Sequence, residues 1–126
     1  NEPNCKAAFD AWSPALQGLN GNELAEAARR MSPHMVYTTV ADYTKQPRFR
    51  YDATIVNYVR QEDVVRGVPM GTGFIDYKAF FDALKQSGYQ GYVAYEMCEV
   101  LEGGGSLENL DKTARKFLEY MREISK

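Results

Sequence analysis

Hydrophobic positions follow two different spacings along the chain, and these spacings alternate. Three short runs combine apolar, aromatic and β-branched residues and predict strands over residues 5–12, 34–41 and 91–98. Elsewhere apolar residues recur every three or four positions, which predicts helices with Asn22, Asp76 and Ser106 as N-caps. The order is strand, helix, strand, long connection, helix, strand, helix. This order predicts βαβ units and a parallel sheet.

Each predicted helix has one apolar face, so each should bury one side against the sheet. Pro33 ends the first helix, and Gly88 suits the C′ position after the second. The three apolar faces consist of Leu24, Ala27, Ala28 and Met31; of Tyr77, Phe80, Phe81 and Leu84; and of Leu107, Leu110, Ala114, Phe117, Leu118 and Met121.

A long connection separates the second predicted strand from the second predicted helix. Residues 43–72 contain Pro47, Pro69 and Gly71, which favour loops and turns. A loop of this length in a compact domain is usually functional or contains short elements of its own. Within it, residues 53–58 fit a helical turn and a short strand equally well.

Composition indicates one globular domain and excludes several other classes of protein. The 126 residues are 44% hydrophobic and 25% charged, which suits a single domain over 1–126. Nine tyrosines and six phenylalanines exclude disorder along the whole length. The net charge of -2 argues against a nucleic-acid partner, and no apolar run is long enough to cross a membrane. With no signal-peptide pattern and only Cys5 and Cys98, we expect free thiols and a cytoplasmic location.

Polar residues at the ends of the predicted strands are the first candidates for a functional site. Asp10 follows the first strand, Thr39 and Asp42 end the second, and Glu96 lies near the end of the third. Parallel α/β proteins bind ligands at the carboxyl ends of their strands, so we expect these residues to meet there. Carboxylate oxygens suit Mg²⁺ or Mn²⁺, and a carboxylate can act as a general base.

Ordinary structural roles are also open to these residues. Asp10 and Asp42 are of the residue type that forms turns and caps after strands. Glu96 differs, because a glutamate between Tyr95 and Met97 in a strand must be paired, coordinated or placed at the mouth of the sheet.

Three further features are candidates for substrate contacts. Arg48 and Arg50 in the long connection can clamp an anionic or polyhydroxyl substrate, and Trp12 can stack on a sugar face. Residues 103–106, three glycines and a serine before a helix, can cradle a phosphate. The structural alternatives are a solvated loop for the arginines, core packing for Trp12, and a hinge with an N-cap for the glycine run.

Four stretches of the sequence, taken together, resemble one known family. They are residues 8–12, 36–42, 68–77 and 88–96. The third contains a Pro-x-Gly-x-Gly segment before a helix, and the fourth contains Gly-Tyr-x-Gly before a strand that ends in Glu96. The set resembles the C-terminal part of the sugar phosphate isomerase/epimerase family, the xylose isomerase-like TIM barrels.

This resemblance implies an α/β fold, a partial TIM (β/α)8 barrel whose three parallel βα units match strands six to eight with their helices. It also implies a divalent metal, with Asp10 as the strand-six ligand and Glu96 as both the strand-eight ligand and the catalytic base. Thr39 stands where the family has a ligating histidine, and Ser13 where it has a substrate-contacting histidine; the strand-five glutamate would precede Asn1. Two alternatives follow for the full-length protein: it binds Mn²⁺ or Mg²⁺ through altered ligands, or it is a relative that has lost the metal. For this chain alone we expect weak or no metal binding.

The implied function is that of a sugar or sugar phosphate isomerase or epimerase, which transfers a proton next to a carbonyl with help from a metal. We expect the full-length protein to be active and this chain alone to be inactive. One alternative is a non-catalytic partial-barrel module that binds a small polar ligand or self-associates, and another is a metal-dependent hydrolase or lyase on the same fold. Three parallel strands leave two unpaired edges, which predicts a homodimer or larger assembly.

Overall fold

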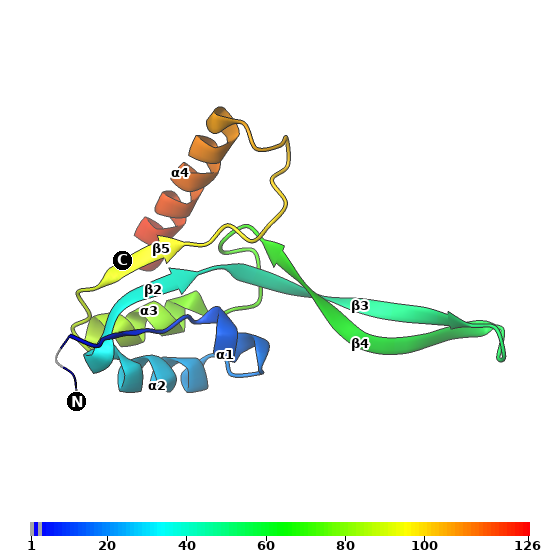
Figure 1. Ribbon diagram of the computed structural model, residues 1–126, viewed down its shortest axis with the longest axis horizontal. Coiled ribbons are helices and arrows are strands. Elements are labelled where there is room, and N and C mark those ends of the chain that lie inside the picture. Colours follow the sequence, from blue (N-terminus) through cyan, green and yellow to red (C-terminus); the bar gives the residue numbers. More distant parts are fainter. Residues whose placement is uncertain (1, 3) are drawn as a thin grey trace.

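A computed structural model describes residues 2 and 4–126 of the chain. This part contains a small parallel sheet, a long antiparallel hairpin and four α-helices (Figure 1). The strands are β1 (Ala7–Ala8), β2 (Met35–Val40), β3 (Asp42–Asp52), β4 (Asn57–Val68) and β5 (Tyr92–Tyr95). The helices are α1 (Trp12–Leu16), α2 (Asn22–Met31), α3 (Tyr77–Gln86) and α4 (Leu107–Ile124), and a 3-10 helix, η1, spans Ser32–His34.

The three shortest strands form a parallel sheet in the order β1-β2-β5. Ala7 pairs with Met35 on one side of β2, and Tyr37 pairs with Tyr92 on the other. Parallel neighbours need a crossover connection, and α2 and α3 lie on the two crossovers. The predicted α/β fold with a parallel sheet is therefore confirmed.

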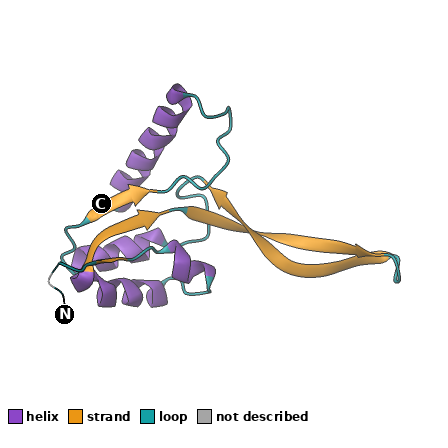
Figure 2. Ribbon diagram, viewed as in Figure 1, coloured by secondary structure: helices purple, strands orange, loops and turns teal. Residues whose placement is uncertain are grey.

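Helices α2 and α3 pack on one face of this sheet (Figure 2). Thr38 and Val40 of β2 have no exposed surface, and they alternate with Tyr37 and Thr39, which belong to the other face. Tyr37 and its partner Tyr92 are 39% and 79% exposed, so no helix in the described part of the chain covers that second face. The helices contribute Leu24, Ala28, Tyr77, Phe80 and Leu84 to the core.

Side-chain caps determine where two of the helices begin. Asp76 accepts a backbone hydrogen bond from the first turn of α3 (2.9 Å), and Ser106 accepts one from the first turn of α4 (3.2 Å). Both predicted N-caps are confirmed. The Asn22 cap is wrong, because α2 begins at Asn22 itself and Gly21, with φ at 54°, makes the entry turn.

The first predicted strand is shorter than the apolar run suggested. Only Ala7 and Ala8 pair as β1, and Trp12 begins a helix that was not predicted. Pro14 lies in the first turn of α1, where a residue without an N–H loses no helical hydrogen bond. The Ser13-Pro14 pair therefore belongs to a helix start and does not end a strand.

The connection between β2 and α3 is a long antiparallel hairpin, which corrects the expectation of a loop over 43–72. Strands β3 and β4 pair along their length, and residues 53–56 form the turn at the tip. Of the two alternatives for 53–58, neither describes the whole segment, because β4 begins at Asn57. The hairpin leaves the parallel sheet and extends past it (Figure 1).

Two local features account for this hairpin. Apolar and charged residues alternate along it, as at Phe49, Arg50 and Tyr51, and a period of two suits a strand. Pro47 lies at a register shift between Gln46 and Arg48, where a residue without an N–H is tolerated. The proline that suggested a loop therefore marks an irregularity within a strand.

Helix α4 packs against the end of β5 and has no fully buried residue. Phe117 stacks on Tyr95 with ring centroids 4.6 Å apart. Leu107 and Leu118, which belong to the predicted apolar face, are 86% and 49% exposed. No helix in the described residues is long and apolar enough to cross a membrane.

Tyr77 offers a test of the packing between α3 and β2. Its buried hydroxyl donates to the C=O of Ala41 (2.6 Å) and accepts from the N–H of Ala41 (3.1 Å). Tyr77→Phe leaves both backbone groups without this partner, so we expect urea denaturation to show a loss of about 1–3 kcal/mol in the free energy of unfolding. Tyr92→Phe is the matched control, because Tyr92 is 79% exposed. Equal losses in the two variants would contradict this role of Tyr77.

Candidate functional site

The carboxyl ends of the three parallel strands bring four of the predicted site residues to one edge of the sheet. Asp10 follows β1 by two residues, Thr39 is the next-to-last residue of β2, and Glu96 directly follows β5. Asp42 begins β3, two residues after the end of β2. We call these four residues the carboxyl edge.

Asp10 is fixed to the middle strand of the sheet. The N–H of Thr39 donates to Asp10 Oδ1 (2.8 Å), and the N–H of Phe9 donates to the C=O of Tyr37 (3.4 Å). These bonds continue the contact between β1 and β2 beyond the two paired residues of β1. Asp10 therefore has a defined orientation although it lies outside a strand.

Glu96 continues the pairing on the opposite side of β2. Its N–H donates to the C=O of Val40 (2.9 Å). Thr39 pairs with Ala94, and side chains alternate along a strand, so Glu96 emerges on the same face as Ala94 and Thr39. Glu96 is exposed, which places its charge at the mouth of the sheet and not within it.

Asp10 and Glu96 therefore flank Thr39 on opposite sides. The outer strands of a three-stranded sheet lie about 10 Å apart, since neighbouring strands are about 4.8 Å apart. Carboxylates on the two sides of the middle strand can accept hydrogen bonds from the hydroxyl groups of a ligand placed over it.

The carboxylate of Asp42 is used within the protein. Asp42 is 2% exposed, and it accepts hydrogen bonds from the N–H groups of Tyr43 (2.9 Å), Gly71 (3.0 Å) and Gly73 (2.8 Å). A Cβ at Gly73 would collide with this carboxylate, so the close approach depends on glycine. Asp42 shapes the carboxyl edge by holding the 69–74 loop against the end of β2.

Two aromatic residues lie beside the carboxyl edge. The rings of Trp12 and Tyr43 have centroids 6.0 Å apart. Burial, then the neighbouring Cys98 thiol and the charge of Glu96, raises the pKa of the Tyr43 hydroxyl. Among the described residues, Trp12 Nε1 is buried without a hydrogen-bond partner. One cluster beside the carboxyl edge therefore combines the aromatic rings of Trp12 and Tyr43 with the carboxylate of Glu96.

Arg48 and Arg50 do not lie at the carboxyl edge. Both belong to the part of β3 that extends away from the sheet (Figure 1), and Arg50 lies 3.5 Å from the carboxylate of Asp52. Tyr43, at the base of the same strand, does reach the edge. The position of Tyr43 directly after Asp42 is the sequence signal that points to this placement.

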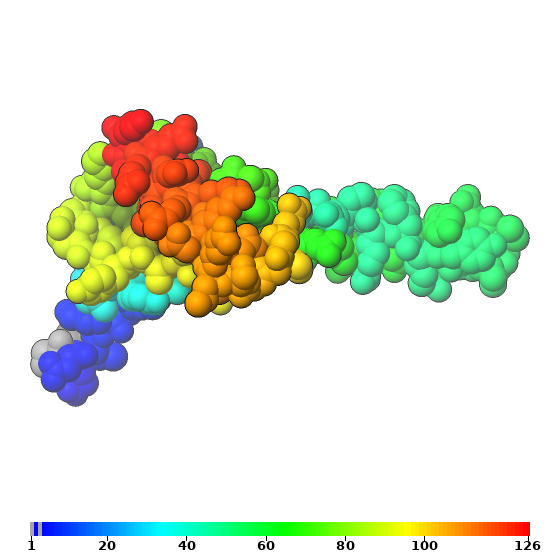
Figure 3. All heavy atoms as spheres, turned by 90° about the horizontal axis from the view of Figure 1, so that it is seen from above, coloured from blue at the N-terminus to red at the C-terminus, as the bar shows by residue number. Residues whose placement is uncertain are grey.

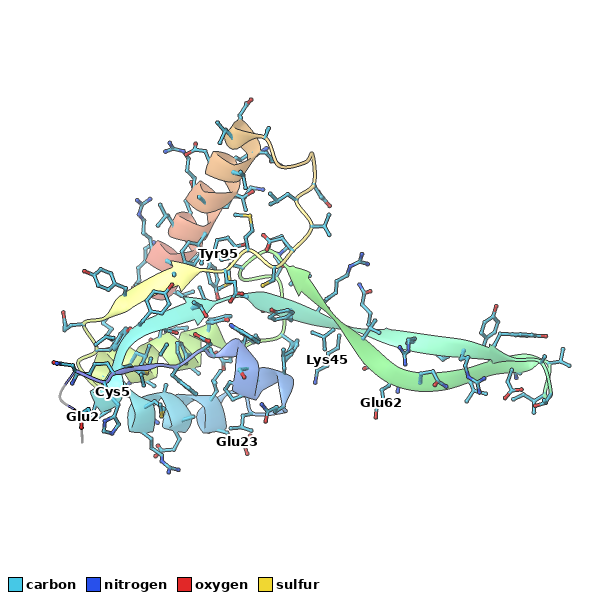
Figure 4. The ribbon with its side chains drawn as sticks, viewed as in Figure 1. Glu2, Cys5, Glu23, Lys45, Glu62 and Tyr95 are labelled. Atoms are coloured by element: carbon cyan, nitrogen blue, oxygen red, sulfur yellow. The ribbon has the colours of Figure 1, made fainter. Side chains whose placement is uncertain are left out.

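A cavity of about 720 Å³ lies between the end of β4, the segment after β5 and the first half of α4. Tyr95, labelled in Figure 4, forms part of its wall. Asn109 holds the glycine run (103–106) beside it, because its Nδ2 donates to the C=O of Gly104 within the run (2.6 Å) and to the C=O of Glu102 directly before it (2.8 Å). The charged residues that line the cavity are of both signs: Arg66, Lys112, Lys116, Glu99 and Glu102.

The residues present do not fit the metal that the family resemblance implies. No group of three or more His, Cys, Asp or Glu side chains within the described residues is arranged to hold an ion. Asp10 and Glu96 supply two carboxylates, whereas Thr39 stands at the position where a ligating histidine is implied. A neutral hydroxyl group is a weaker ligand than imidazole for such a divalent cation.

These features agree with a match to one protein family. Residues 1–124 match the family described as xylose isomerase-like TIM barrel. The chain belongs to this family. The predicted resemblance is confirmed, and no curated protein matched the chain in a separate comparison.

Membership of the xylose isomerase-like TIM barrel family makes the carboxyl edge the first place to look for a functional site. A TIM barrel has eight parallel strands, and its active site lies at their carboxyl ends. The described part of the chain forms a sheet of three parallel strands, and Asp10, Thr39 and Glu96 lie at their carboxyl ends.

Asp42→Asn tests how this edge is held together. An amide has one acceptor oxygen, whereas the carboxylate accepts from three N–H groups. We expect a loss of about 1–3 kcal/mol in the free energy of unfolding and faster hydrogen exchange at the amides of Gly71 and Gly73. The control is Asp111→Asn, because Asp111 is exposed and bonds only on the surface of α4 to Arg115. Unchanged exchange at both glycines would contradict this role of Asp42.

Proposed function

We propose that this chain forms the part of a sugar or sugar phosphate isomerase or epimerase barrel that contains strands six to eight, supplied here by β1, β2 and β5. The observation that carries the proposal is the placement of Asp10 and Glu96 at one edge of a parallel sheet in a member of this family. The ligand would lie over Thr39, between the two carboxylates. The remaining strands of the barrel would pair with β1 and β5.

The reaction would be proton transfer next to a carbonyl group. The Glu96 carboxylate takes a proton from the hydroxyl-bearing carbon beside the carbonyl; the electron pair of that C–H bond forms the C=C bond of an enediolate, and the π pair of the carbonyl moves onto its oxygen. Glu96 then returns the proton to the former carbonyl carbon while the hydroxyl proton passes from the second oxygen to the first, so that the carbonyl forms at the second carbon and the isomerisation is complete. Tyr43, whose pKa is raised chiefly by burial, stays protonated at neutral pH and can donate a hydrogen bond to a substrate oxygen.

Other residues of the edge would bind and orient the substrate. Asp10, held by the N–H of Thr39, would accept hydrogen bonds from sugar hydroxyls. Trp12, which packs beside Tyr43, would cover one face of the sugar ring. Arg48 and Arg50 have no part in this arrangement, because they lie on the hairpin.

Glu96→Gln is the test of this function, made in a protein whose barrel includes this chain. General acid–base catalysis contributes about 10²- to 10⁴-fold to a rate, so we expect a loss of that size in exchange of the substrate C–H proton with solvent deuterium. Aldoses and ketoses, with and without phosphate, form the substrate panel. Glu102→Gln is the control, because Glu102 lies in the loop beyond Glu96 and is also exposed. A Glu96→Gln variant with unchanged exchange would contradict the proposal.

Metal binding by this chain alone should be weak or absent. Two carboxylates supply too few ligands for a divalent cation that prefers six. Calorimetric titration with Mn²⁺ should give no saturable heat at micromolar protein. Tight binding that Asp10→Asn or Glu96→Gln abolishes would overturn this expectation.

The alternative function, a non-catalytic module, is favoured by one observation. Thr39 and Ser13 replace both histidines that the family resemblance implies. Such a module would bind the same sugars at the carboxyl edge, and Trp12→Ala would weaken that binding, without any exchange of substrate protons. The deuterium-exchange assay therefore separates the two functions.

A further inference from the structure

The hairpin has a distal part that touches little of the rest of the chain. We call residues 45–66 the arm. It extends past the carboxyl edge in two perpendicular views (Figures 1 and 3). A two-stranded ribbon by itself is only marginally stable in water, because it has no sheet or helix to cover either face. Packing against another surface would therefore stabilise the arm.

One face of the arm is aromatic. Tyr51 pairs with Tyr58 and Phe49 with Arg60, and alternation places the three aromatic residues on the same face. The two tyrosine rings meet edge to face at 5.4 Å. Phe49, Tyr51 and Tyr58 are 53%, 50% and 65% exposed. Three neighbouring aromatic side chains at this exposure are typical of an interaction surface.

The arm and the rest of the chain have opposite charge. The arm contains five Lys or Arg residues and three Asp or Glu residues, whereas the remainder contains ten and fourteen. The basic residues of the arm are Lys45, Arg48, Arg50, Arg60 and Arg66. A second copy of this chain therefore offers a body whose net charge is complementary to the arm.

We propose that this chain forms a dimer in which each arm packs its aromatic face against the body of the other copy. The surface area that each arrangement would bury favours this exchange of arms over contact between the two arms. A large aromatic side chain buries about 150–250 Å², so the exposed halves of three rings amount to about 300 Å². Contact between two arms would bury about 600 Å² in total, which is below the roughly 1,200 Å² of a stable interface. Two arms on two bodies bury about twice as much and reach that value.

The arm would still be free in a complete barrel. Further strands would add sideways, to the edges of β1 and β5, whereas the arm extends along the strand direction beyond the carboxyl edge (Figure 1). Closing the barrel therefore does not cover the aromatic face. The proposal does not depend on the proposed catalytic function.

The first experiment measures the mass of the chain in solution over a range of roughly 1 to 100 µM, by sedimentation and light scattering. Wild type should be a dimer in the upper part of this range. The double variant Tyr51→Ser/Tyr58→Ser should dissociate at a concentration at least about tenfold higher than wild type.

The matched control replaces another cross-strand tyrosine pair. Tyr37 and Tyr92 pair across β2 and β5 and are also exposed, but they lie on the parallel sheet. Tyr37→Ser/Tyr92→Ser should leave the dimer unchanged. A dimer that this control disrupts and the arm variant does not would overturn the proposal, because the sheet face and not the arm would then hold the copies together.

A second variant tests the proposal even if the serine substitutions unfold the hairpin. Arg48→Glu/Arg50→Glu keeps all three aromatic residues and reverses the charge of β3, so it should also weaken the dimer. Added salt should weaken the wild-type dimer, because it screens the attraction between arm and body.

Cross-linking distinguishes the exchange of arms from other dimers. A photoreactive phenylalanine at Tyr58, in a mixture of isotope-labelled and unlabelled chains, should join the arm of one copy to peptides outside residues 45–66 of the other. Two results would overturn the proposal: cross-links between the two arms only, or a wild-type monomer at every concentration.

Discussion

The structure depends on how one buried carboxylate is satisfied. At the end of β2 the chain leaves the sheet, runs out along the hairpin and returns to begin α3. Asp42 accepts three N–H groups from the outgoing and the returning segments, while Tyr77 binds both backbone groups of Ala41 beside it. Unpaired polar groups at such a buried place would cost free energy, so these bonds allow the chain to pass the same point twice.

This junction lies between two surfaces of different character. The carboxyl edge is assembled from strands that are distant in sequence, and ladder bonds fix Asp10 and Glu96 at their positions. The arm is one continuous segment with few contacts of its own. Tyr43 lies between the two, because it follows Asp42 in β3 and precedes the arm, and the pKa of its hydroxyl is raised by burial and also by Cys98 and the charge of Glu96.

Helices and strands that bury an apolar face could be predicted, because their buried residues must recur at the spacing of that helix or strand. Tyr77, Phe80 and Leu84 follow a helical period, and α3 forms there after the predicted Asp76 cap. The hairpin buries little, so its alternation did not indicate a core, and Pro47 suggested a loop instead.

The candidate site likewise has a part that the sequence predicts and a part that it does not. The meeting of Asp10 and Glu96 follows from parallel topology, which strand order alone indicates. The bonds of Asp42 to Gly71 and Gly73 depend on the return of the hairpin, for which no local pattern exists. Arg48 and Arg50 were misplaced for that reason, since a loop can fold back over the sheet and a paired strand cannot.

The alternation of side chains along the hairpin also limits how such an arm can vary among relatives. One residue added to each strand between its base and the tyrosines would move the tyrosines to the opposite face, whereas two on each would lengthen the arm by about 7 Å and restore them. Insertions between the base and these tyrosines should therefore occur in steps of four residues.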